Sequence, residues 1–399
     1  MTRLRHVAAI NPSTPQFDRL SSDAVLPFVP LEAVWSYGLD LSRRRPKGDV
    51  ESGYTRFAEG DIVLPKITPT FQADRTTIAT GLEGGIAAGT TELHVVRTSD
   101  RAESRYVRYL LSSRPFLRGG EAEMIGVAGQ RRVPDDWLRN FSVPVLDLPE
   151  QRAIADFLDT ETARIDAVVA KKRQLCAVLE DRERVRIAKE LQTNASGTIP
   201  LRRLLSRPPQ YGAAEPGEHG DTDWPRYIRI TDLRADGSLA GDGVKRLPPE
   251  VAHPFLLHDD DLLFARSGAT SGKAFRYRAS MGPACFAGYL IRFRFNTARV
   301  LPALVELWTR TSHYWGQITE SAVQATIQNV NAERYLELRL PDVPRSRQPA
   351  LIEAMTQVRR VHSEARTRLA RQIALLQEHR QALITAAVTG ELEIPGVAA

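Results

Sequence analysis

The chain has 399 residues, of which 42% are hydrophobic and 26% are charged, and its formal net charge is +6. This composition is typical of a globular protein, and the length predicts two or three domains. The opening residues lack an apolar run long enough for a signal peptide, and no later run could span a membrane, so we expect a cytoplasmic protein.

Residues 1–147 are expected to form a first globular unit. Clusters of Gly and Pro separate short apolar segments, and one longer segment has helical spacing. This pattern predicts a mixed α+β unit with a twisted sheet. The predicted strands are Pro27–Pro30, Asp61–Lys66, Thr91–Arg97 and Asn140–Val143, and the predicted helix is Glu103–Ser112.

Residues 148–197 are expected to hold one long helix, from Leu148 to Gln192. After its opening Pro-Glu pair, the segment has no Gly or Pro until Gly197. About 43 helical residues would span roughly 65 Å. The apolar residues repeat at coiled-coil spacing between charged positions, which predicts packing against a second helix. That seam consists of Ile154, Leu158, Ile165, Val168, Leu175 and Leu179.

The second half of the chain repeats this order, with a globe at 198–346 and a helix within 347–399. We expect Arg207–Trp224, rich in Pro, Gly and acidic residues, to be a surface loop. The predicted strands are Tyr227–Thr231, Asp261–Arg266, Tyr289–Phe295 and Tyr335–Leu340, and the predicted helix is Pro302–Thr309. The distal helix has its seam at Leu351, Met355, Val358, Ala365, Leu369, Leu376 and Leu383.

An internal repeat connects the two halves. Gln151 and Gln348 are 197 positions apart, and the same offset aligns further residues along the chain. These include the pairs Leu4 with Leu201, Arg97 with Arg294, and Pro144 with Pro341. Equivalent halves would be related by a pseudo-two-fold axis, so their helices would pair antiparallel. The expected fold class is therefore α+β, with two tandem globular α+β domains separated by two long antiparallel coiled-coil helices.

Catalytic and cofactor motifs are incomplete. Gly268–Lys273 resembles a phosphate-binding loop but is one residue short, and Ala274 stands where Ser or Thr should bind magnesium. The His residues show no metal spacing, so we expect no catalytic residue and no metal site. Cys176 and Cys285 are far apart, which favours isolated thiols in a reducing compartment.

Loops at strand ends offer candidate contacts to nucleic acid. Arg, Lys and Gln are side chains that contact base edges and phosphates, and small neighbours let the backbone approach a phosphate. The alternative for each residue is an ordinary solvated surface position. The candidates are Lys66 and Arg131 in the first globe, and Arg266, Lys273 and Gln328 in the second.

Several segments carry a resemblance that covers essentially the whole chain. They are LPEQRAIADFLDTETARIDAVVAKKRQL from Leu148, LLQEHRQALITAAVTGELEI from Leu375, GDIVLPKITP from Gly60, GTTELHVVR from Gly89 and LLFARSGATSGKAF from Leu262. The chain resembles the specificity subunit of type I restriction-modification systems, the HsdS family. One departure is Arg345–Gln348, where that family often repeats a Leu-Pro-Glu-Gln-like helix start.

The resemblance implies a function. Each globe would be a target-recognition domain that reads one half of a split double-stranded DNA sequence. The helix pair would set the gap and dock two methyltransferase (M) subunits, joined in some systems by restriction (R) subunits. S-adenosylmethionine, ATP and Mg would then belong to the partner subunits, and this chain would hold no cofactor.

Two alternatives remain at this point. One is a non-catalytic protein–protein adaptor with two binding globes on a rigid helical spacer. The other is an enzyme with a degenerate nucleotide site at Gly268–Lys273. Salt-dependent binding to duplex DNA would favour the specificity-subunit interpretation over the adaptor.

Overall fold

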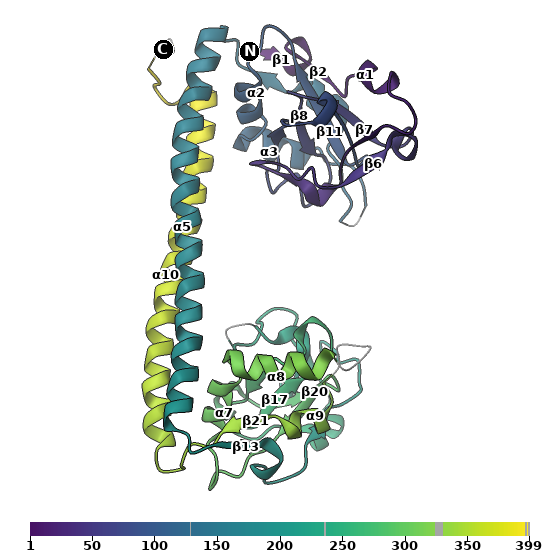
Figure 1. The fold of residues 1–399 in the computed structure, drawn as a ribbon. Coiled ribbons are helices and arrows are strands. Elements are labelled where there is room, and N and C mark those ends of the chain that lie inside the picture. Colours follow the sequence, from purple (N-terminus) through teal and green to yellow (C-terminus); the bar gives the residue numbers. More distant parts are fainter. Residues whose placement is uncertain (128, 235–236, 324–329, 396, 398–399) are drawn as a thin grey trace. The chain divides into compact units, whose positions relative to one another are not determined.

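The computed structural model describes residues 1–127, 129–234, 237–323, 330–395 and 397. It divides into two compact units, one of Met1–Arg173 with Ala370–Ala399 and the other of Gln174–Leu369. Each unit holds one α+β domain and part of both long helices, α5 (Leu148–Asn194) and α10 (Gln348–Thr389) (Figure 1).

The first domain contains two four-stranded sheets. One is fully antiparallel with the order β2-β11-β8-β9, and the other has the order β6-β3-β10-β7 with β3 and β10 parallel. The strands are β2 (Ala8–Ile10), β11 (Leu93–Thr98), β8 (Ile62–Pro65), β9 (Thr77–Ile78), β6 (Arg44–Pro46), β3 (Val25–Val29), β10 (Ile86–Gly89) and β7 (Thr55–Ala58). Every residue of the continuous apolar strand β8 is buried, as expected for a central strand.

Shorter elements complete this domain. The strands β1 (Thr2–Arg3) and β12 (Ser142–Val143) pair, as do β4 (Val34–Trp35) and β5 (Gly38–Leu39). The helices are α1 (Pro15–Asp18), α2 (Ser104–Leu110), α3 (Arg114–Ala122) and α4 (Asp135–Asn140). Residues from α2, α5 and the end of α10 share one buried core, so the helix pair is part of the domain's hydrophobic structure.

The second domain repeats the plan. Its sheets have the orders β14-β20-β17-β18 and β16-β15-β19, with β15 and β19 parallel. The strands are β14 (Gln210–Tyr211), β20 (Leu290–Phe293), β17 (Leu262–Ala265), β18 (Ala274–Arg276), β16 (Lys245–Arg246), β15 (Arg226–Ile228), β19 (Ala284–Phe286) and the pair β13 (Thr198–Pro200) and β21 (Arg339–Pro341). The helices are α6 (Pro249–Ala252), α7 (Pro302–Trp308), α8 (Ser312–Val323) and α9 (Ala332–Glu337).

Two buried glutamines show how closely the halves correspond. Gln151 Oε1 accepts from the Glu103 N–H at 2.9 Å, and its Nε2 donates to the carbonyl oxygens of Arg101 and Leu146. Gln348 makes the same three bonds, to the Leu301 N–H at 2.8 Å and to the carbonyls of Arg299 and Val343. The duplication expected from the sequence is thus present in the bonding of each helix to its own domain.

The two long helices run antiparallel within each unit. In the first unit, Asp166 on α5 pairs with Arg380 on α10 at 3.1 Å. In the second unit, Glu183 pairs with Arg359 at 3.6 Å and with Arg366 at 3.4 Å. Later residues of α5 therefore meet earlier residues of α10, which confirms the predicted orientation.

The start of α5 is fixed by a capping box. The Glu150 N–H donates to the Asp147 carboxylate at 2.8 Å, and the Asp147 N–H donates to the Glu150 carboxylate at 3.0 Å. Pro344 and Arg347 occupy the corresponding positions before α10. Neither can reproduce these bonds, since Pro has no N–H and Arg has no acceptor.

Several predicted elements differ from those in the structure. The strand predicted at Tyr335–Leu340 is wrong in its first half, because Tyr335–Glu337 end α9 and only Arg339–Pro341 form β21. The Arg207–Trp224 loop is not wholly a surface loop, since Gln210 and Tyr211 join the sheet as β14. The seam predicted through Val168 and Leu175 is also wrong, because both side chains are exposed and Val169 is buried instead.

Candidate nucleic-acid interface

Lys66 and Arg266 occupy equivalent positions, directly after the central strands β8 and β17. The Lys66 N–H donates to the Glu92 carbonyl at 2.9 Å, and its own carbonyl accepts from the Val133 N–H at 2.8 Å. The Arg266 main chain makes the same two bonds, with the carbonyl of Tyr289 at 3.0 Å and the N–H of Val330 at 2.8 Å. Both domains therefore hold a half-buried cation at the same strand end.

Lys66 lies in a charged environment. Arg132 donates two hydrogen bonds to the Glu92 carboxylate, at 2.7 and 2.8 Å. These bonds, with smaller contributions from the charges of Arg132 and Lys66, hold the pKa of Glu92 below its ordinary value against the effect of its partial burial. Among the described residues, no acidic side chain lies within ion-pairing distance of Lys66, so its ammonium group is available to a phosphate or a base.

His94 supports this strand end from inside the domain. Its ring is fully buried, with Nε2 2.9 Å from the Val133 carbonyl and Nδ1 3.4 Å from an Asp135 carboxylate oxygen. Burial lowers the pKa of His94, and the nearby Lys66 charge lowers it further, while the Val133 carbonyl and Asp135 oppose the shift. His94 is thus a packed histidine and not a surface contact.

The structure gives Arg131 a role in the fold. Its guanidinium donates to the Met124 carbonyl at 3.0 Å and reaches the Glu121 carbonyl at 3.5 Å, just beyond the end of α3. Cations suit the carbonyl end of a helix. Arg131 remains a predicted DNA contact, but its side chain is half-buried and already binds main-chain carbonyls at and just after the end of α3.

Arg266 rests on an aromatic ring. Its guanidinium carbon lies 5.2 Å from the centroid of Tyr211, and the Tyr211 hydroxyl accepts from the Ala332 N–H at 3.1 Å. Within the part of the chain that the structure describes, the buried Nε of Arg266 has no hydrogen-bond partner. Sequence reasoning missed Tyr211, because a two-residue strand is too short to show an alternating pattern.

Lys273 lies at the end of a rigid turn after β17. The Gly272 N–H donates to the Tyr335 hydroxyl at 3.1 Å, and the Tyr314 hydroxyl donates to the Gly272 carbonyl at 2.6 Å. Gly272 has a φ of +88°, and an added Cβ would lie 2.9 Å from the Trp315 ring. Lys273 is followed by the strand β18, whereas a phosphate-binding loop opens a helix. This geometry removes the support for a nucleotide site at Gly268–Lys273.

The structure brings the remaining candidates together only in part. Lys66 and Arg131 share the first domain, where the Thr68 N–H donates to the Arg131 carbonyl at 2.9 Å. Arg266 and Lys273 flank the same turn of the second domain, and the Ala265 N–H donates to the Lys273 carbonyl at 2.8 Å. Gln328 lies outside the described residues.

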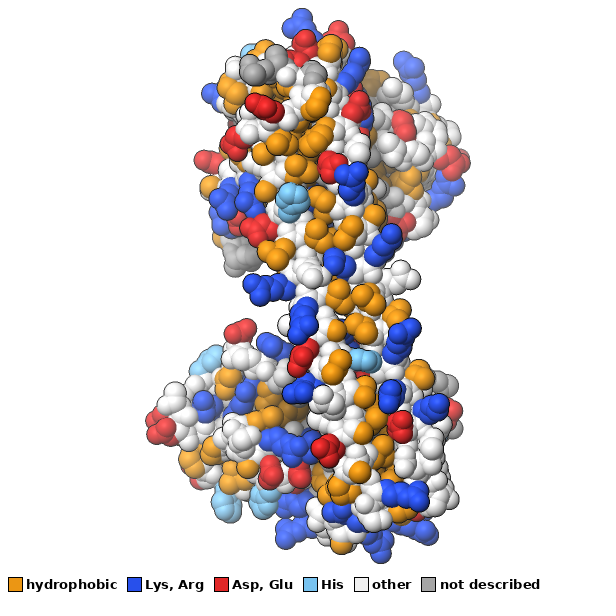
Figure 2. All heavy atoms as spheres, turned by 90° about the vertical axis from the view of Figure 1, so that its left-hand side faces the viewer, with side chains coloured by type: hydrophobic (Ala, Val, Ile, Leu, Met, Phe, Trp, Pro, Cys, Tyr) orange, Lys and Arg blue, Asp and Glu red, His pale blue; other side chains and the backbone are white. Residues whose placement is uncertain are grey.

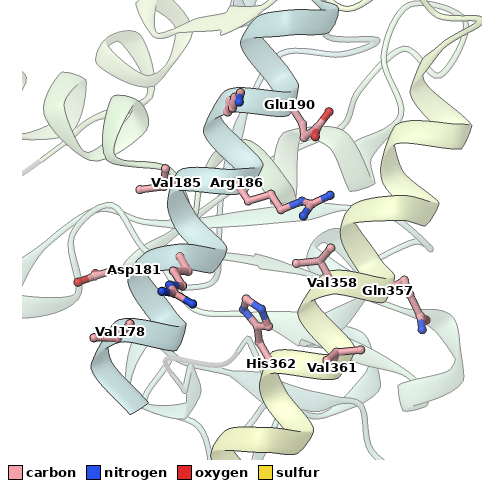
Figure 3. A pocket seen from close by; sticks show the side chains of 11 residues that line it. Val178, Asp181, Val185, Arg186, Glu190, Gln357, Val358, Val361 and His362 are labelled. Carbon is pink, nitrogen blue, oxygen red and sulfur yellow. The ribbon is translucent and has the colours of Figure 1, made fainter. Parts of the chain in front are cut away.

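A second candidate site is a groove between α5 and α10 in the second unit (Figure 3). Its volume is about 910 Å³, and Val178, Val185, Val358 and Val361 supply apolar walls between charged residues. Val185 is 66% exposed and Val361 is 52% exposed. Within the second unit, the exposed Leu175 extends these residues into an apolar stripe on α5 and α10. Figure 2 shows hydrophobic side chains lying among charged ones on this face.

The stripe explains the error in the predicted seam. Val168, Leu175, Val178 and Val185 have coiled-coil spacing of their own, so α5 carries two adjacent apolar faces. The face that packs on α10 includes the buried, polar Glu183, which pairs with Arg359 and Arg366. Apolar periodicity alone therefore selected the wrong residues in the middle of the helix.

In the described part of the chain, no three His, Cys, Asp or Glu side chains gather as metal ligands. None of the described helices is long and apolar enough to cross a bilayer.

The chain is similar to known proteins over part of its sequence and throughout its fold. No protein-family model matches the chain. It is 38% identical over 159 residues to the specificity subunit of the type I restriction enzyme EcoAI of Escherichia coli, covering 38% of this chain and 26% of that protein. It is 37% identical over 180 residues to the EcoEI specificity subunit of Escherichia coli, covering 44% of this chain and 28% of that protein. The chain thus matches about a quarter of the length of these curated relatives.

A solved structure extends the similarity to the whole fold. A chain from a study of complex assembly and conformational transition of the type I R-M system superposes with a TM-score of 0.70 and 16% identity. The match covers 98% of this chain and 97% of that one, so the order of domain, helix, domain and helix is shared throughout. Over 38–44% of its length the chain is thus similar to type I restriction-enzyme specificity subunits, and its whole fold matches that of a chain from the type I R-M system.

Proposed function

We propose that this chain recognises a bipartite double-stranded DNA target, with each α+β domain reading one half. The observation that carries the proposal is the equivalence of Lys66 and Arg266. Each follows the central strand of its domain and is held by the same pair of main-chain bonds. Two copies of one cationic strand end suit two separate duplex contacts, because phosphates and base-edge acceptors attract such side chains.

The proposed division of labour follows the expected boundaries. Residues 1–147 and 198–346 are the two target-recognition domains, and 148–197 and 347–399 supply the helices that set the spacing. The chain itself performs no catalysis. Adenine methylation with S-adenosylmethionine, and any ATP- and Mg-dependent cleavage, would belong to partner subunits in the cytoplasm.

The groove and stripe on the helix pair suit the proposed methyltransferase partners. Exposed valines between charged residues can receive the apolar face of a partner helix. Val185→Glu puts a charge at the most exposed valine of the groove and should abolish co-purification with the methyltransferase subunits, while the isolated chain still binds DNA. Val25→Glu is the matched control, since Val25 is 59% exposed in the first domain. If the Val185→Glu chain assembles normally, the methyltransferase subunits bind another surface of the chain.

The recognition proposal is tested by exchange of one domain. Residues 1–147 are replaced by the equivalent unit of a relative, and methylated sites are mapped in cells with the parental gene, the exchanged gene or neither. We expect one half-site to change and the other to stay. If both half-sites changed together, the two domains would not read the target independently. If deletion of the gene left the methylation pattern unchanged, the chain would be better explained as a protein–protein adaptor.

A further inference from the structure

An ordered stack of three side chains stands on the surface of the first domain. The rings of Trp35 and Tyr37, on the β4–β5 hairpin, lie parallel within 9° with their centroids 6.0 Å apart. The guanidinium carbon of Arg75 lies 4.3 Å from the centroid of the Trp35 ring. Tyr37 is 83% exposed and Trp35 is 37% exposed. Single exposed apolar residues are common, but two aromatic rings and a cation stacked in water indicate a contact surface.

One arginine holds the stack in place. The guanidinium of Arg108, on α2, donates to the Ser36 carbonyl at 2.6 Å and to the Thr76 carbonyl at 3.3 Å. Ser36 lies between the two stacked rings in the sequence, and Thr76 follows Arg75. The hairpin and the Arg75 segment are therefore fixed to the same helix. A preorganised surface loses little side-chain freedom when it binds.

The stack is built on the strands that carry Lys66. The connection from β8 to β9 begins at Lys66 and ends just after Arg75. The hairpin packs on the same two strands, with β4 against β8 and β5 against β9. Among the described residues, neither Arg75 nor Lys66 has an acidic side chain within ion-pairing distance. An aromatic surface with cations that form no close ion pair suits a polyanion better than an acidic or neutral protein surface.

The second domain differs at the same place. A bridge joins Leu233 and Leu239 there, as β4 pairs with β5 in the first domain. Arg234, which is exposed, occupies the position of Trp35. One recognition domain thus presents an aromatic ring where the other presents a cation. Such a difference is expected if the two turns contact two different half-sites.

We propose that Trp35, Tyr37 and Arg75 form a DNA-contacting element of the first domain. Trp35 and Tyr37 pack against sugars and base edges in a groove of the first half-site, and Arg75 contacts an adjacent phosphate. The proposal rests on the proposed function, because it needs the first domain to bind duplex DNA.

The test uses the full chain and a duplex that carries the target found by methylation mapping. We expect Tyr37→Ala and Trp35→Ala to weaken binding at least tenfold, and Trp35→Tyr to retain most of it. Arg75→Gln should lower the slope of log affinity against log salt by about 1. Tyr37→Ala is the safer variant for folding, because that side chain is almost fully exposed. Val25→Ala, an exposed apolar position in the same domain, is the control and should bind as the parent does.

Tryptophan fluorescence gives an independent readout. Addition of the duplex should quench the signal of the parent chain and of Trp137→Phe, whose ring packs among Phe116 and Phe141. The quenching should be lost in Trp35→Phe. A duplex with a scrambled first half-site should bind the parent and Tyr37→Ala equally, whereas scrambling the second half-site should preserve the difference between them.

Three outcomes would overturn the assignment. Unchanged affinity in Tyr37→Ala and Trp35→Ala would remove the stack from the DNA site. Unchanged affinity with loss of methyltransferase binding would assign the stack to a protein partner. If the parent chain binds no duplex at any salt concentration, the proposed function fails and the stack proposal fails with it. If the parent chain binds the duplex and the variants bind it equally well, the proposed function stands and only the stack proposal fails.

Discussion

The carboxylate of Asp61 accepts two hydrogen bonds from the guanidinium of Arg97, each 2.7 Å long. The Asp61 side chain is 2% exposed and also accepts from the Ala58 N–H at 2.7 Å. Asp261 and Arg294 form the same pair in the second domain, again with two bonds of 2.7 Å. In each domain the pair joins the start of one central strand to its antiparallel neighbour.

Removal of the Asp61 carboxylate should destabilise the first domain. Asp61→Ala leaves the partly buried Arg97 cation without its partner, and breaking a buried pair costs about 3 kcal/mol. Urea unfolding, together with hydrogen exchange of β8 and β11, measures the loss. Asp18→Ala breaks an exposed pair with Arg56 and should cost less than about 1 kcal/mol. Equal losses in the two variants would mean that burial does not strengthen the Asp61 pair.

Glu306 should make the second unit sensitive to acid. Burial alone would raise its pKa, but the charges of Arg276, Arg359 and Arg310 outweigh burial and hold the pKa below 4.5. A depressed folded-state pKa stabilises the fold above the unfolded value and loses that stabilisation as the pH falls through the folded value. The free energy of unfolding should therefore decrease as the pH drops below about 4.5.

The variant Glu306→Gln tests this assignment. At pH 7 it removes the carboxylate that pairs with Arg276 at 2.6 Å, with Arg359 at 3.5 Å and with Arg310 at 3.6 Å, and it should lower stability by about 3 kcal/mol. Urea unfolding of the parent and the variant should converge as the pH falls, because protonated Glu resembles Gln. The control Glu337→Gln affects an exposed pair with Arg202. A pH-independent difference between Glu306→Gln and the parent would contradict the role of the Glu306 charge.

Tyr211 should position Arg266 for DNA contact. Tyr211→Leu removes the ring under the guanidinium and should weaken duplex binding and relax the same base position as Arg266→Ala. Tyr211→Phe keeps the ring and should retain specificity. The double variant Tyr211→Leu with Arg266→Ala should bind no worse than Arg266→Ala alone. Additive losses would show that Tyr211 acts independently of Arg266.

The helix pair should measure the gap between half-sites. Glu183 bridges to Arg359 and Arg366, so an insertion after Asp181 would disturb that contact. A paired insertion leaves the Glu183 contact in place. Four helix-forming residues are inserted after Lys172 in α5 and four before Gln372 in α10, because the Lys172 ammonium donates to the Gln372 side chain at 2.7 Å and the two sites therefore lie side by side. Each helix then gains about 6 Å and turns about 40° beyond a full turn.

Rotation favours a spacer longer by about one base pair, because one step of DNA turns roughly 34–36°. The added rise is nearer two base pairs, but bending can absorb a few ångströms, whereas a domain on the wrong face loses its base contacts. Some loss of stability is expected, since the insertion unwinds the coil locally. Methylation mapping is the measurement. An active variant with the parental spacer would show that another element sets the gap.

The sequence alone determined the order of the chain and its duplication. Long uninterrupted periodicity specifies α5 and α10, since a segment with no Gly or Pro after its first turn can keep one regular helical conformation. The offset that aligned Arg97 with Arg294 and Gln151 with Gln348 also identified residues with the same bonds in both halves. Strand centres such as those of β8 and β17 were predictable as continuous apolar runs.

Tertiary structure decided which face of each element is buried and which side chains meet. The choice of Val169 over Val168 in α5 depends on α10, because both faces of that helix are apolar. Arg131 looks like Lys66 in the sequence, yet the end of α3 binds its guanidinium and leaves Lys66 available. Contacts between segments distant in the chain, such as Trp35 with Arg75 and Tyr211 with Arg266, have no periodic signal. They arise only when the folded backbone brings those segments together.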